Sequence, residues 1–143
     1  MAVARFLDTN VILSAYDIDA PQKRAIALQI LRDGWDAPGT VALSVQVLQE
    51  LHVNLTRRGV TLAEATAIVR DFDDWPVVET THALLLAALD EQARWRISLW
   101  DALILAAART AGAAELVTED LNDGQDYGGV RVWNPFARRS AQA

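Results

Sequence analysis

Acidic side chains recur in this chain at places where chemistry is commonly positioned. Asp8 directly follows a short apolar run, and Asp120 follows another closely. Asp101 lies in the first turn of a predicted helix, and Glu50 lies about two turns into a second one. A metal ion held by carboxylates can activate water and neutralise charge on a phosphate group. Convergence of these four acids would therefore indicate metal-assisted hydrolysis of a phosphodiester.

Charge repulsion gives a physical reason for a cation among these acids. Two carboxylates about 5 Å apart repel by roughly 3 kcal/mol at an effective dielectric constant of about 20. Three or four converged carboxylates would therefore take up protons or bind a cation. The chain has no cysteine, and its two histidines, His52 and His82, have no spacing that suggests a metal site. Ligands that are all oxygen favour Mg²⁺, with Mn²⁺ as a possible substitute, over zinc.

Each acid also has an ordinary structural explanation. Asp8 could cap a turn, Glu50 could be a solvated helix residue, and Asp101 could be the capping-box partner of Ser98. Asp120 lies in a stretch rich in turn-forming residues. Four polar residues could orient the carboxylates or a water molecule: Thr9, Asn10, Ser44 and Thr118. The prediction of a site therefore depends on all four acids reaching one edge of the fold.

The elements that must position these residues alternate between strands and helices. Strands are predicted over residues 3–7, 40–43, 76–78, 115–118 and 130–133. Helices are predicted over residues 21–33, 44–58, 61–73, 81–95 and 98–111, with Gly34, Gly59 and Gly112 just past three of their ends. This alternation predicts a mainly parallel sheet covered on both faces. In such sheets the ligand lies outside the carboxyl ends of the strands, which is where the acids fall.

The bulk composition limits the class of protein. The 143 residues are 52% hydrophobic, which fits one folded domain, predicted here over residues 1–136 with a flexible tail at 137–143. Neither a signal peptide nor a membrane-spanning run is expected, so we expect a cytoplasmic protein. A net charge of −6 argues against a polyanionic partner unless bound metal offsets it. The pairs Arg57–Arg58 and Arg138–Arg139 could contact phosphates or simply be solvated.

Four segments of the chain resemble, in order, the motifs of PIN-domain nucleases. They are Leu7–Leu13, Ser44–Leu51, Ser98–Ile104 and Val117–Leu121. Residues 130–136 resemble the last strand of the VapC-type toxins in that family. The resemblance implies a three-layer α/β/α fold with a five-stranded, mainly parallel sheet. It also implies a Mg²⁺-dependent endoribonuclease that is the toxin of a type II toxin–antitoxin pair, inhibited by a VapB-like antitoxin and forming homodimers.

The same resemblance suggests roles for the acids. Asp8 and Asp101 correspond to metal ligands, and Glu50 corresponds to a ligand or to the residue that orients the water. The fourth position varies within the family, and the chain offers Glu119, Asp120, Asn122 and Asp123 there. We choose Asp120, with Asp123 as the reserve. An antitoxin that neutralises this site should place an arginine or lysine near Asp8 and Asp101 and should have an apolar anchor.

Other protein classes fit the residues less well. A response-regulator receiver needs a lysine near its last strand, whereas the only lysine, Lys23, lies in the first predicted helix. A haloacid-dehalogenase-type phosphatase needs a second aspartate at position 10, which is Asn10. No glycine-rich nucleotide-binding motif occurs. A metal-dependent DNA nuclease and a non-catalytic binding module on the same fold remain as alternatives.

Overall fold

Five parallel strands form the centre of the computed structural model, which describes residues 2–137. The strands are β1 (Arg5–Leu7), β2 (Val41–Ser44), β3 (Val77–Val78), β4 (Glu115–Val117) and β5 (Arg131–Trp133). Each corresponds to a predicted strand, and every pairing between neighbouring strands is parallel. Arg138, Arg139 and the rest of the predicted tail beyond Ala137 lie outside the described residues.

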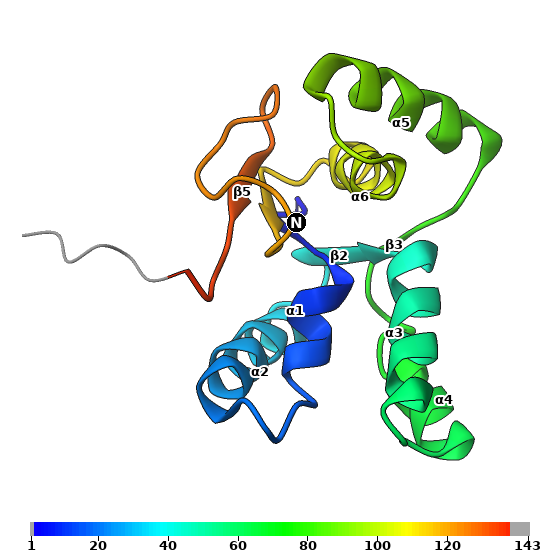
Figure 1. Ribbon diagram of the computed structural model, residues 1–143, viewed down its shortest axis with the longest axis vertical. Coiled ribbons are helices and arrows are strands. Elements are labelled where there is room, and N and C mark those ends of the chain that lie inside the picture. Colours follow the sequence, from blue (N-terminus) through cyan, green and yellow to red (C-terminus); the bar gives the residue numbers. More distant parts are fainter. Residues whose placement is uncertain (1, 138–143) are drawn as a thin grey trace, which may run out of the picture.

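Helices cover both faces of the sheet. They are α1 (Thr9–Ser14), α2 (Pro21–Asp36), α3 (Val45–Arg57), α4 (Leu62–Arg70), α5 (His82–Trp95) and α6 (Leu99–Thr110). Figure 1 shows α1 to α4 on one side of the sheet and α5 with α6 on the other, so the predicted three-layer α/β/α fold is confirmed. No helix within residues 2–137 has the length and apolar character needed to cross a bilayer.

The order of the strands reverses between β1 and β4. The order is β3-β2-β1-β4-β5, so the chain first moves away from β1 in one direction and then returns on its other side. The carboxyl ends of β1 and β4 therefore border the point where the strand order reverses. Ligands of open α/β folds bind at such a point. Asp8 directly follows β1, and Thr118 directly follows β4.

The core explains why β1 is central. Phe6 and Leu7 are fully buried, as is Leu116 in the neighbouring strand β4. Because both faces of the sheet are covered, the short strands read as continuous apolar runs rather than as an alternating pattern. Burial of this apolar surface fixes the register Leu7↔Val117, which places the residues after β1 and β4 side by side.

Two features of the helices differ from the sequence-based prediction. The prediction contained no helix over Thr9–Ser14, whereas α1 forms there, capped by Asp8. The prediction also ended the first long helix before Gly34, whereas α2 continues to Asp36. Gly34 is needed inside the helix because Trp75 covers it: a Cβ atom there would lie 2.5 Å from the Trp75 Cη2 atom. The glycine marks a close packing contact and not a helix end.

Candidate active site

Asp8 lies at the centre of the site and is held on several sides. Its Oδ1 atom accepts a hydrogen bond from the Thr9 backbone amide at 2.7 Å, which caps α1. Its Oδ2 atom accepts a hydrogen bond from the Thr118 hydroxyl at 2.8 Å. The residue is only 4% exposed. Asp8 is therefore both the expected helix cap and a buried carboxylate at the edge of the sheet.

Burial and neighbouring charges perturb this carboxyl group. Removal from water raises the pKa of Asp8 from 3.8 to about 7. The hydrogen bonds from Thr118 and Thr9 oppose this rise, whereas the negative charges of Asp120 and Glu50 add to it. A strongly perturbed acid in a crevice is typical of functional sites. A cation beside Asp8 would favour its charged form.

Glu50 reaches the site from α3 on the same side of the sheet as α1. Its Oε2 atom accepts a hydrogen bond from the Thr9 hydroxyl at 2.9 Å, and its Oε1 atom accepts one from the Gln46 side-chain amide at 2.8 Å. Thr9 therefore touches Glu50 while its backbone amide holds Asp8. Gln46 lies one helical turn before Glu50, and that spacing is the sequence signal that identifies it as a partner.

Ser44 affects the position of Glu50 indirectly, by capping the helix that carries it. It is buried at the end of β2, and its hydroxyl accepts a hydrogen bond from the Val47 backbone amide at 3.3 Å. It thereby caps α3, the helix that carries Glu50. This contact is an indirect contribution to the position of Glu50, and the orientation of a carboxylate or a water by Ser44 stays a prediction.

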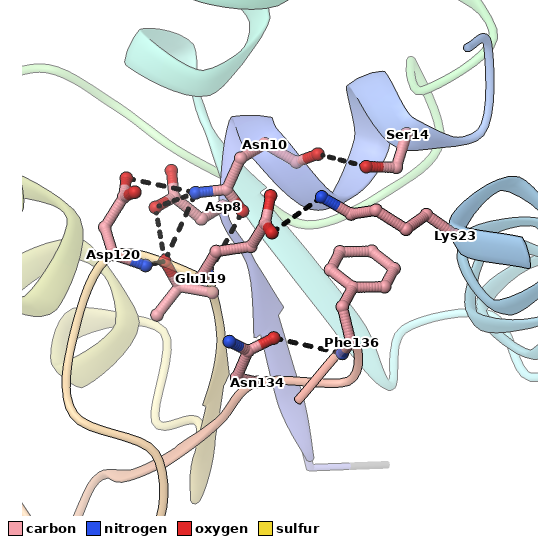
Figure 2. Close-up of polar contacts among 9 residues, drawn as sticks. Asp8, Asn10, Ser14, Lys23, Glu119, Asp120, Asn134 and Phe136 are labelled. Carbon is pink, nitrogen blue, oxygen red and sulfur yellow. Dashed lines mark hydrogen bonds and ion pairs between the residues drawn. The ribbon is translucent and has the colours of Figure 1, made fainter. Parts of the chain in front are cut away.

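Asn10 joins the first acidic segment to the last one. Its Nδ2 atom lies 3.0 Å from Asp120 Oδ2 and 3.5 Å from Asp8 Oδ2. Its Oδ1 atom accepts a hydrogen bond from the Glu119 backbone amide at 3.3 Å. Thr118 adds a second link, because its hydroxyl accepts a hydrogen bond from the Asp120 backbone amide at 3.1 Å. Figure 2 shows contacts running from the Asn10 side-chain amide to both Asp8 and Asp120.

Asp101 approaches from the helical layer on the other face of the sheet. Ser98 caps α6 by accepting a hydrogen bond from the Asp101 backbone amide at 3.1 Å. Partial burial raises the pKa of Asp101, hydrogen bonding with Ser98 lowers it, and the charges of Asp120 and Glu50 raise it further. Asp101 therefore shares the electrostatic environment of the other acids, as its position in the sequence predicts.

The structure also separates the two candidates for the fourth acid. Asp120 influences the pKa of both Asp8 and Asp101. Asp123 instead accepts a hydrogen bond from the Asn134 backbone amide at 2.9 Å, which fastens its loop to the segment after β5. These contacts favour Asp120 as the fourth member of the cluster. We call Asp8, Glu50, Asp101 and Asp120 the carboxylate cluster.

The carboxylate cluster has the chemical composition of a site for a hydrated divalent cation. Within residues 2–137, no three acidic or imidazole side chains lie close enough, as they stand, to enclose a metal ion. Mg²⁺ does not require such a cage, because it keeps several waters and binds through one or two carboxylates. The acids supply only oxygen ligands; burial is the main cause of the raised pKa values of Asp8 and Asp101, and the negative charges of Asp120 and Glu50 add to it. This donor set fits Mg²⁺ or Mn²⁺.

The predicted basic pair Arg57–Arg58 and the lysine Lys23 lie in different places relative to the carboxylate cluster. Arg57 and Arg58 are exposed at the end of α3. Arg58 lines a separate groove of about 690 Å³ together with Tyr16, Ile18 and Val60. Lys23, by contrast, lies at the border of the cluster, where it forms an ion pair with Glu119. The sequence contained no signal for that contact, because the two residues are 96 positions apart.

Comparison with known proteins agrees with this geometry. The model of the PIN domain family matches residues 5–122. Ribonuclease VapC24 of Mycobacterium tuberculosis is 30% identical to the chain over 142 residues, covering 91% of this chain and 95% of that protein. A toxin–antitoxin complex from Klebsiella pneumoniae has a chain of the same fold, with a TM-score of 0.67, 19% identity, and coverage of 93% of this chain and 98% of that one.

A second solved structure shares the fold. VapC20 of Mycobacterium tuberculosis, described as a toxin that cleaves the sarcin–ricin loop, superimposes with a TM-score of 0.63 and 24% identity. The match covers 79% of this chain and 87% of that one. The family model spans far more than half of the sequence, and the similarity to VapC24 extends over nearly all of it. The chain therefore belongs to the PIN-domain family and is one of its VapC-type members.

Proposed function

We propose that this protein is a Mg²⁺-dependent endoribonuclease that serves as the toxin of a type II toxin–antitoxin pair. The observation that supports this most directly is the carboxylate cluster at the carboxyl ends of β1 and β4. It combines a buried Asp8, whose pKa is raised to about 7, with three further acids contributed by other elements. Such a group suits a cation that acts on a phosphodiester. The name of the relative VapC24 supports RNA as the substrate.

Each residue of the carboxylate cluster would have its own role in the reaction. Asp8, Asp101 and Asp120 would hold the hydrated cation, directly or through its bound waters, and the cation would supply a more acidic bound water and neutralise charge on the phosphate. Glu50 is fixed by Thr9 and Gln46, so it would either bind the cation or orient the attacking water. Asn10 and Thr118 would hold the carboxylates of Asp8 and Asp120 in fixed positions relative to each other. This assignment places the chemistry at the carboxyl ends of β1 and β4, where the strand order reverses.

The proposal includes a protein inhibitor. Related folds occur in a toxin–antitoxin complex from Klebsiella pneumoniae and in VapBC from Salmonella typhimurium. A VapB-like antitoxin would place an arginine or lysine beside Asp8 and Asp101, where negative charge is concentrated. Its apolar anchor would fit the groove bordered by Tyr16 and Ile18, because Ile18 is 79% exposed there. We also propose a homodimer that acts on RNA in the cytoplasm.

A nuclease assay with matched substrates tests the activity. Purified protein would be incubated with single-stranded RNA, structured RNA and DNA, with Mg²⁺ or with chelator, beside the variants Asp8→Asn and Asp101→Asn. We expect RNA cleavage that requires Mg²⁺ and that falls at least about a hundredfold in both variants. Asp90→Asn, which changes an exposed carboxylate on α5, serves as the control. Metal-dependent cleavage of DNA alone would contradict RNA as the substrate.

A further inference from the structure

Three separate segments of the chain meet at the ammonium group of Lys23. Its Nζ atom lies 2.7 Å from Glu119 Oε2 in the loop after β4. The same atom lies 4.7 Å from the centre of the Phe136 ring, in the segment after β5. Figure 2 shows Lys23 reaching from α2 to Glu119, beside the ring of Phe136. The only lysine of the chain thus links α2 to Glu119, the residue that directly precedes Asp120 of the carboxylate cluster.

A short path of contacts leads from Lys23 to the fourth acid. Glu119 directly precedes Asp120, and its backbone amide donates to Asn10 Oδ1 at 3.3 Å. Asn10 in turn donates from Nδ2 to Asp120 Oδ2 at 3.0 Å. A displacement of Glu119 would therefore move the backbone of Asp120 and would disturb the amide group that orients its carboxylate.

Stability alone does not account for this ion pair. The side chains of Lys23 and Glu119 are 41% and 30% exposed, respectively. Ion pairs with that much access to solvent contribute little to the free energy of unfolding. A displacement of about 1 Å at a catalytic site can nevertheless lower the rate by about a hundredfold. The expected effect of Lys23 is therefore on the site and not on the fold.

We propose that Lys23, through its ion pair with Glu119, is a positioning residue that holds Asp120 in the carboxylate cluster. The inference rests on the proposed nuclease function. It differs from a direct contact between Lys23 and the phosphate of the substrate. The ammonium is already engaged by Glu119 on one side and by Phe136 on another, which favours a structural link within the site.

Four variants test the proposal: Lys23→Met, Glu119→Gln, the double variant, and Lys23→Arg. We expect Lys23→Met and Glu119→Gln each to lower kcat for RNA cleavage by about tenfold, with KM changed less than about twofold. The double variant should be no worse than either single one, because both remove the same link. Lys23→Arg should restore most of the rate, since a guanidinium can pair with Glu119.

Three measurements do not depend on cleavage. Titration calorimetry with Mn²⁺ should show weaker binding, by roughly tenfold, in Lys23→Met. Hydrogen exchange at the Asp120 amide, which donates to Thr118, should become faster by roughly tenfold. The melting temperature should change by less than about 2 °C. Arg24→Met is the matched control, because Arg24 is exposed on the same helix and forms no ion pair within residues 2–137.

The outcomes separate this inference from its alternatives. If Lys23→Met raises KM at constant kcat while Glu119→Gln lowers KM, Lys23 contacts the phosphate and the positioning role is overturned. Unchanged kinetics, Mn²⁺ affinity and exchange in Lys23→Met would also overturn it. If the wild-type protein cleaves no RNA but Mn²⁺ affinity and exchange still respond to Lys23→Met, the positioning role stands and the proposed function fails.

Discussion

At the scale of single residues, Asp8 combines two functions that usually conflict. A capping aspartate favours its charged form, because it accepts a hydrogen bond from a backbone amide at the positive end of a helix dipole. Burial opposes that charge, and here burial is the larger effect, so the pKa rises. The short helix α1 therefore begins on a carboxyl group that gains a proton readily when no cation is present.

This balance predicts how the stability of the metal-free protein depends on pH. The pKa of Asp8 is about 7 in the folded state, above its ordinary value of 3.8. The stabilisation from its protonated form is therefore complete below about pH 4 and is lost as the pH rises towards 7. Asp8→Asn should remove that loss. With chelator present, we expect its melting temperature to exceed that of the wild type by at least about 4 °C at pH 8.

The comparison is made as a difference between the two proteins, because other carboxylates also titrate at low pH. The excess in melting temperature of Asp8→Asn, measured by calorimetry, should shrink steadily between pH 7 and pH 5. A difference that stays constant over this range would mean that Asp8 does not titrate there.

At the scale of elements, helix caps position the acids. Ser44 and Ser98 cap α3 and α6, which carry Glu50 and Asp101. In α6 the coupling is direct, because the backbone amide that Ser98 binds belongs to Asp101 itself. Thr61 caps α4 in the same way, but α4 carries no member of the carboxylate cluster. The caps are thus similar in geometry and different in what they position.

This difference predicts a split between stability and activity. Ser98→Ala and Thr61→Ala should each lower the free energy of unfolding by about 1 kcal/mol. Only Ser98→Ala should also lower the rate of RNA cleavage, by roughly tenfold, because the first turn of α6 holds Asp101. Denaturant unfolding and cleavage assays on the same preparations measure both. Equal losses of activity in the two variants would show that the effect is one of general stability.

At the scale of the whole molecule, a net charge of −6 must be reconciled with a polyanionic substrate. Four of the negative charges belong to the carboxylate cluster, at one edge of the sheet. A cation bound there would lower the repulsion where the phosphate must approach. The rest of the surface would contribute little attraction, so binding of RNA should depend on the site more than on a general positive field.

Metal binding should therefore be visible in the stability of the protein. At a free Mg²⁺ or Mn²⁺ concentration of about 100 times its dissociation constant, linkage predicts about 2.7 kcal/mol of added stability. That corresponds to a rise of several degrees in melting temperature by thermal-shift measurement. The rise should be absent in Asp8→Asn and in NaCl of matched ionic strength. An equal rise in Asp8→Asn would place the metal elsewhere.

The sequence by itself determined the kinds and order of the elements, apart from the short helix α1. Apolar runs predicted the five strands, and Ser44, Thr61, Thr81 and Ser98 predicted the starts of four helices. These signals are local, because a cap or an apolar run acts within a few residues. The same local signals placed the four acids at strand ends or in the helices that follow strands. The alternation of strands and helices then indicated one common edge.

Only the tertiary structure decided what each residue contacts across the sheet. Gly34 is typical of a helix end by sequence but lies inside α2 against Trp75, and the six residues of α1 are too few to form a helical pattern. The structure also favoured Asp120 over Asp123, through the bridge from Asn10 and the fastening of Asp123 to Asn134. The contact of Lys23 with Glu119 joins distant parts of the chain. Such contacts arise from packing between elements, which no local spacing encodes.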